Sequence, residues 1–124
     1  MMDRNRRGWA LRYLREAIDE IKIVKKDERA FDLVVDALRK AQMAVYCSLG
    51  DPSVINDVVS EMIESGLPQN NPILKFLVEI EKSINYLEEV QHTYVSDIFL
   101  KESERLIMLA SQIVNVIMSL YPED

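Results

Sequence analysis

Residues 30–50 read AFDLVVDALRKAQMAVYCSLG, and their apolar side chains recur with the spacing of one helical face. The members of this face are Ala30, Phe31, Val34, Ala37, Leu38, Ala41, Ala44, Val45 and Leu49. Gly50 follows as the expected stop, because glycine readily adopts the left-handed conformation that ends many helices. The stretch therefore predicts a helix over residues 28–49 that buries one face.

A second amphipathic segment precedes this helix. Its apolar residues recur mostly at steps of three and four, and they are Ala10, Leu14, Ala17, Ile18, Ile21 and Val24. This pattern predicts a helix over residues 4–26. Only a short junction ending in Asp27 joins the two helices, and Asp27 can accept hydrogen bonds from the free N–H groups of the second one. A connection this short predicts an antiparallel helical hairpin.

Two proline-containing signals start further helices. Asp51-Pro52 and Asn71-Pro72 each combine a capping side chain with a proline at the first helical position. They predict helices over residues 52–65 and 72–92. A last helix is expected over residues 97–121.

No stretch of the chain alternates apolar and polar residues with a period of two, so no strand is predicted. The five helices should cover more than about 60% of the chain. The predicted fold is all-α: an up-and-down four-helix bundle with one extra short helix between the second and third long helices. A chain of 124 residues has room for one core, so residues 1–124 are predicted to form a single domain.

The charge of the chain is acidic overall and unevenly spread. The net charge is −6, yet residues 1–40 hold 11 Lys and Arg against 8 Asp and Glu. An acidic chain is a poor general binder of nucleic acid, because neutralised phosphates supply most of that affinity. The basic cluster near the start includes Arg4, Arg6 and Arg7. It is interpreted as a solvated helix face, with a phosphate or RNA contact as the alternative.

The sequence also limits the compartment and the metal chemistry of the protein. The first residues lead into no apolar signal core and no run of 18 apolar residues occurs, so a cytoplasmic protein is expected. One cysteine, Cys47, and one histidine, His92, are too few for a Cys/His zinc site. Glu89 and His92 form a Glu-x-x-His pair, but a di-iron bundle needs two such pairs and two more glutamates. No metal and no other cofactor is therefore predicted.

Three stretches of the sequence carry a family resemblance. The first joins residues 9–17 to the alanine-spaced residues 37–44 and the Leu49-Gly50 end of that helix. The second is the triplet His92-Thr93-Tyr94, and the third is the run over residues 104–110 in the last predicted helix. Together they resemble a HEPN domain, of the higher eukaryote and prokaryote nucleotide-binding family. The resemblance implies an up-and-down four-helix bundle that is often dimeric.

Some members of this family are ribonucleases with an Arg-x(4–6)-His motif, whose arginine and histidine meet across a dimer. On that resemblance, His92 matches the histidine and Tyr94 the tyrosine of the His-x-Tyr form. The arginine would fall at position 85, 86 or 87, where this chain has Asn85, Tyr86 and Leu87. No cation is available there to stabilise the charge of a phosphate transition state. Ribonuclease activity is therefore not expected.

Other members of the family are partners of small nucleotidyltransferases, which leaves two possible functions. The preferred one is a non-catalytic, HEPN-like interaction module that forms a homodimer and has a nucleotidyltransferase as a candidate partner. The alternative is an RNA-directed HEPN protein, ribonuclease-like or RNA-binding, that uses His92 with Arg4, Arg6 and Arg7. His92 and Tyr94 are the candidate functional residues.

The last predicted helix suggests how a homodimer would form. Its apolar arc is about 200° wide, whereas a surface helix needs a stripe of about 100°. A core seam is predicted from Leu106, Leu109, Ala110, Ile113, Ile117 and Leu120. Ile107, Val114, Met118 and Tyr121 lie to one side of this seam, and they are predicted to form the dimer interface. The alternative is that the short helix over residues 52–65 covers this surface within one chain.

Overall fold

The computed structural model describes residues 4–27, 30, 32–66, 70–90 and 97–121, and 92% of these residues are helical. The five helices are α1 (Arg4–Lys26), α2 (Asp32–Leu49), α3 (Pro52–Ser65), α4 (Pro72–Val90) and α5 (Asp97–Leu120). Within the described ranges there is no strand. The predicted all-α class is therefore confirmed, and the helical content exceeds the predicted value.

Four of the five predicted helices begin at the predicted residue. For α2, predicted from residue 28, the described helix begins at Asp32, and residues 28, 29 and 31 lie outside the described residues. The Ala30 N–H donates to the Asp27 carbonyl and the Leu33 N–H donates to the Ala30 carbonyl, both over 3.0 Å. Backbone hydrogen bonds thus tie Ala30 to the end of α1 and to the first turn of α2.

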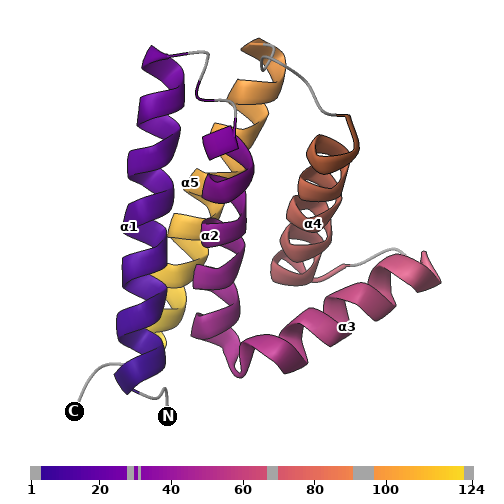
Figure 1. The fold of residues 1–124 in the computed structure, drawn as a ribbon. Helices are drawn as coiled ribbons and strands as arrows, with labels where there is room; N and C mark the ends of the chain where they lie inside the picture. Colours follow the sequence, from indigo (N-terminus) through magenta and orange to yellow (C-terminus); the bar gives the residue numbers. More distant parts are fainter. Residues whose placement is uncertain (1–3, 28–29, 31, 67–69, 91–96, 122–124) are drawn as a thin grey trace.

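The helices are arranged around α2. It packs against α1, α3, α4 and α5, and α1 is its most extensive partner. Figure 1 shows α1 and α2 as an antiparallel pair, with α5 behind them and α4 on the other side of α2 from α1. The shorter α3 runs outward from the lower end of α2 and leads to the lower end of α4 (Figure 1).

Small side chains allow α1 and α2 to approach each other closely. Ala10 and Ala17 of α1 are fully buried, as are Ala37, Ala41 and Ala44 of α2. The larger core side chains are contributed by α2, α4 and α5, and the fully buried ones include Leu38, Leu77, Ile80, Ile84, Leu106 and Ile107. Burial of one such side chain stabilises the fold by about 2 kcal/mol. The core therefore spans all the long helices.

Two predicted helix caps are confirmed by their hydrogen bonds. The Asp51 carboxylate accepts from the Ser53 N–H at 2.9 Å at the start of α3, with Pro52 in the first turn. The Asn71 side-chain oxygen accepts from the N–H groups of Ile73 at 2.9 Å and Leu74 at 3.2 Å at the start of α4. These bonds satisfy backbone donors that a helix N-terminus otherwise leaves unpaired.

The C-terminus of α3 has the left-handed turn expected of glycine. Gly66 has a φ of 65° and donates its N–H to the Met62 carbonyl. A residue with a side chain would be strained in this conformation, so glycine is the residue that ends α3 at the lowest cost.

None of the described helices is long and apolar enough to cross a membrane.

Candidate functional site

The orientation of α5 about its own axis differs from the predicted one. Ile107, Val114 and Met118 are 1%, 0% and 6% exposed, so these side chains lie in the core of the chain. The prediction that they form an exposed dimer interface is wrong. The reason is that α5 packs against α1, α2 and α4 together. The side of α5 that holds these three residues faces those helices. Tyr121, the fourth predicted interface residue, is exposed.

Three of the six residues predicted as the core seam of α5, Leu106, Ala110 and Ile117, are buried, and the other three are not. Leu120 is 67% exposed, Leu109 and Ile113 are half-buried, and Val116 beside them is 58% exposed. These four residues follow one another at steps of four, three and four, which is the spacing of a coiled-coil seam. We refer to Leu109, Ile113, Val116 and Leu120 as the α5 stripe.

A pocket of about 400 Å³ lies between α4 and α5, beside the upper half of this stripe. Its lining is mostly apolar, and the lining residues are Pro72, Ile73, Lys75, Phe76, Glu79, Arg105, Leu109 and Ile113. Such a volume is in the range that holds a few large side chains or a small ligand. Two residues of the α5 stripe, Leu109 and Ile113, therefore line the pocket. The other two, Val116 and Leu120, lie beyond it toward the end of α5.

Above the pocket, α4 and α5 are joined by an aromatic stack and an ion pair. The Tyr86 and Phe99 rings stack with their centroids 5.5 Å apart. Closer to the pocket, the Arg105 guanidinium contacts the carboxylates of Glu79 on α4 and Glu102 on α5. The pocket thus opens where these contacts between the two helices end.

Three residues occupy the positions where the motif arginine would fall. Tyr86 takes part in this stack, Asn85 is exposed and Leu87 is buried. His92 and Tyr94, the two candidate functional residues, lie outside the described residues. Glu89, the partner of His92 in the Glu-x-x-His pair, is exposed near the end of α4. Within the described part of the chain, no group of three His, Cys, Asp or Glu residues could hold a metal ion.

The N-terminal arginines have different surroundings. The Arg7 guanidinium donates to the Tyr121 carbonyl at 3.0 Å, at the C-terminus of α5. A cation at this end complements the partial negative charge of the helix dipole. Arg6 lies beside the corner between α2 and α3, where its guanidinium would be 3.7 Å from a Cβ at Gly50. Arg6 and Arg7 are both half-buried, whereas Arg4 is exposed. Arg7 thus has a structural role that the sequence-based interpretation did not include.

A cluster of charged residues between α1 and α2 was missed by the sequence-based reasoning. The Lys40 ammonium lies 3.0 Å from the Asp36 carboxylate and 3.6 Å from the Glu16 carboxylate, and it also contacts Glu20. Burial and a hydrogen bond with Asp36 raise the pKa of Glu20 to about 6, against an opposing effect of Lys40. The hydrogen bonds with Glu20 and Asp36 raise the pKa of Lys40. The cluster links α1 to α2 through charges that are only partly exposed.

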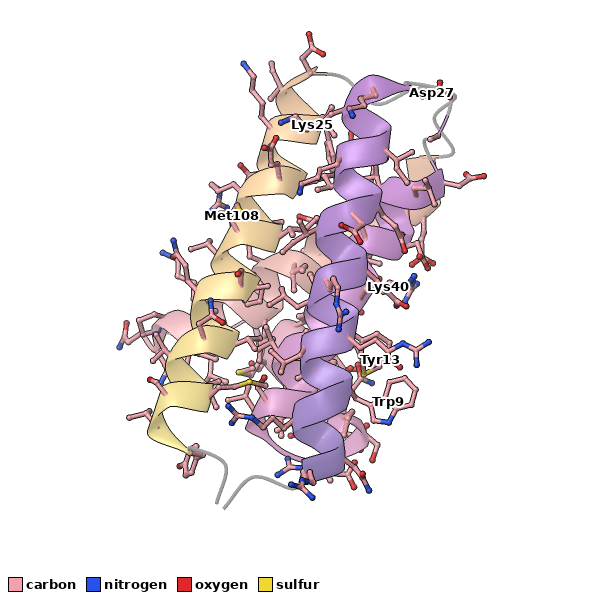
Figure 2. All side chains as sticks on the ribbon, turned by 90° about the vertical axis from the view of Figure 1, so that its left-hand side faces the viewer. Trp9, Tyr13, Lys25, Asp27, Lys40 and Met108 are labelled. Carbon is pink, nitrogen blue, oxygen red and sulfur yellow. The ribbon has the colours of Figure 1, made fainter. Side chains whose placement is uncertain are left out.

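A small aromatic group lies on the opposite side of the molecule from the outer face of α5. The Trp9 and Tyr13 rings are 5.5 Å apart, and the Arg12 guanidinium lies 5.2 Å from the Trp9 ring. Figure 2 shows Trp9 and Tyr13 on one edge of α1, and Met108 on the far edge of α5, pointing away from α1. The aromatic group and the outer face of α5 are therefore separate surfaces.

The chain was compared with protein-family models, with curated proteins and with solved structures, and none of these comparisons found a match. The features that bear on function are those of this chain itself: the α5 stripe, the α4–α5 pocket and the charged cluster around Lys40.

Proposed function

We propose that the chain is a non-catalytic helical interaction module that works as a homodimer through α5. The observation that carries this proposal is the α5 stripe, because it places two exposed apolar side chains, Val116 and Leu120, in line with two half-buried ones, Leu109 and Ile113, along one helical face. Single exposed apolar residues are common on soluble proteins, but a contiguous apolar surface usually marks an interface. Two identical copies of one surface pair most simply about a two-fold axis.

The composition of α5 supports self-association. No charged residue occurs between Leu106 and Leu120. Charges are depleted at the centre of protein interfaces, because burying them costs free energy unless they are paired. Two copies of this face therefore meet without repulsion and without leaving a buried charge. Met108 adds a further exposed apolar side chain to the same helix.

The finer architecture belongs to the same proposal: α1, α2, α4 and α5 form an up-and-down four-helix bundle, with α3 as the extra short helix. In support, each of the four long helices packs against at least two of the others: α1 with α2 and α5, α4 with α2 and α5, and α2 with α5 across the middle. In the described residues α3 contacts α2 and α4 alone. A bundle of this kind presents one face of α5 outward.

The HEPN resemblance extends the proposal to the partner. It implies a nucleotidyltransferase as the second partner of the homodimer. The exposed residues of α1 and α3 offer surface for such a protein when α5 is used by the dimer, since Trp9, Val54 and Val58 are exposed there. Co-purification of the two proteins as a complex with two copies of this chain is the expected result.

The homodimer is tested by light scattering coupled to size-exclusion chromatography. The wild type should elute with twice the mass of the chain. The double variant Val116→Glu/Leu120→Glu should be monomeric, because it places two charges on the apolar surface. As a matched control, Asn115→Glu/Ser119→Glu adds the same charges to exposed positions of α5 outside the stripe and should stay dimeric. A monomeric wild type, or a stripe variant that remains dimeric, would refute the proposal.

The non-catalytic part of the proposal is tested with single-stranded RNA. Purified protein should cut the RNA no faster than buffer does, and His92→Ala should make no difference. Cleavage that disappears in the His92→Ala variant would instead establish the RNA-directed alternative. Retention on RNA that falls steeply with rising salt would point the same way, through phosphate contacts.

A further inference from the structure

The α5 stripe borders the α4–α5 pocket at one end and presents the exposed Leu120 side chain at the other, on the same helical face. Leu109 and Ile113 line the α4–α5 pocket, together with Ile73 and Phe76 of α4. Leu120 projects from the other end of the stripe and is among the most exposed large apolar side chains of the described residues. A surface with both features can be complementary to a second copy of itself.

The spacing of the stripe selects the direction in which two copies pair. In a two-fold dimer, residue i of one chain faces residue j of the other, and j faces i. The pair Leu109–Leu120 and the pair Ile113–Val116 share one midpoint, between Val114 and Asn115. A single two-fold axis perpendicular to α5 therefore brings both pairs together in an antiparallel arrangement. A parallel arrangement would place Leu120 against Leu120 and leave both pockets unfilled.

We propose that α5 pairs antiparallel with α5 of a second copy, with Leu120 of each chain seated in the α4–α5 pocket of the other. This inference rests on the proposed homodimer and gives it a register. Apolar atoms of Leu120 and Val116 leave water and contact Leu109, Ile113, Ile73 and Phe76 of the partner chain. The pocket volume of about 400 Å³ is ample for these two side chains.

The charges around the pocket are complementary to the end of α5. Lys75 lines the pocket, is exposed and has no ion-pair partner among the described residues. The last turn of a helix carries partial negative charge on its carbonyl groups, and in α5 the Arg7 guanidinium of the same chain donates to one of them, that of Tyr121. Antiparallel pairing brings this turn of the partner close to Lys75. Parallel pairing would instead place the two negative helix ends side by side, where they repel each other.

Cysteine cross-linking tests the register in a Cys47→Ala background, which removes the buried native thiol. Leu109→Cys and Leu120→Cys are made as separate proteins that carry tags of different size. The two proteins are mixed, allowed to exchange subunits and oxidised. Antiparallel pairing predicts a disulfide between the two different chains and none when either protein is oxidised alone. In a parallel dimer these two positions would lie about 16 Å apart along the helices, beyond the reach of a disulfide.

The controls separate this register from the homodimer itself. Asn115→Cys lies on exposed α5 surface outside the stripe, so it should not cross-link to itself or to either stripe variant. Ile73→Cys replaces Leu109→Cys if the latter does not fold, as judged by its helical circular dichroism, and it too should pair with Leu120→Cys alone. A monomeric wild type in sedimentation would remove the proposed homodimer. A dimer in which each cysteine variant cross-links to itself, or in which no pair cross-links, would keep the homodimer and overturn the antiparallel register.

Discussion

Glu20 is the residue whose protonation should most affect the contact between α1 and α2. Burial and the Asp36 carboxylate raise its pKa to about 6, although Lys40 favours the charged form. A carboxyl group with a raised pKa in the folded state binds its proton more tightly there than in the unfolded chain. Its contribution to stability is therefore fully present below the unfolded value of about 4.5 and is lost as the pH rises through 6.

The variant Glu20→Gln imitates the protonated form, because its amide lacks the negative charge that burial and the Asp36 carboxylate disfavour. We expect its stability at pH 7.5 to be equal to that of the wild type or higher by less than about 1 kcal/mol. The stability of the variant should also change less than that of the wild type between pH 4.5 and 6. Urea unfolding at several pH values measures both effects. Asp19→Asn, on the exposed face of α1, is the control and should follow the wild type. Strong destabilisation by Glu20→Gln at pH 7.5 would show that the ion pair with Lys40 dominates.

The charged cluster also shows which residue contacts a sequence can predict. Glu16 and Glu20 are four residues apart, as are Asp36 and Lys40, so each pair is visible as one helix face in the sequence. What brings the two pairs together is the axial register of α1 against α2. That register is set by the packing of buried alanines between the helices, which leaves no signal in the charge pattern. Contacts within a helix were therefore predictable, and contacts between helices were not.

At the scale of a helix, the cap of α4 gives a direct test of the sequence signal. The Asn71 side-chain oxygen accepts two backbone N–H groups, and Pro72 follows it. Asn71→Ala removes the acceptor, and we expect it to cost about 1 kcal/mol of unfolding free energy. Asn71→Asp is the matched control: it keeps an acceptor and adds a negative charge at the positive end of the helix dipole, so it should cost little or nothing. Chemical denaturation compares the three proteins, and equal losses in both variants would contradict a capping role.

The last helix shows where periodicity stops being informative. The sequence predicted α5 within one residue of its observed ends, and it predicted the wide apolar arc, but only half of the predicted core seam is buried: Leu106, Ala110 and Ile117. The observed core sector is turned by about 70° from the predicted one, at 100° per residue. Both sectors are apolar, so the hydrophobic pattern does not distinguish them. The position of α5 against α1, α2 and α4 decides between them, and that position depends on the whole core.

At the scale of the molecule, the contacts are unevenly distributed among the helices. The central helix α2 packs against all four others, and its last two turns are buried on nearly every side. The pair α4 and α5 has the least extensive contact among neighbouring long helices, and the pocket lies between them. The surface proposed for dimer formation thus coincides with the least closed part of the chain, where a second copy would add the most packing.

The same distribution predicts that the helices open at different free energies. In α3, Val59 is the one buried side chain, and this helix contacts α2 and α4 alone among the described helices. Regions with few buried contacts open locally without global unfolding, whereas central helices exchange their amide protons with the global transition.

We expect the amides of α3 to exchange with deuterium about 100-fold faster than those in the middle of α2, after correction for intrinsic rates. Hydrogen exchange read by mass spectrometry on peptides from residues 52–65 and 37–45 measures this difference. The peptide from residues 10–24 of α1 is the control and should be protected like α2, because these two helices share the largest contact. Equal protection of α3 and α2 would mean that the short helix unfolds only with the whole molecule.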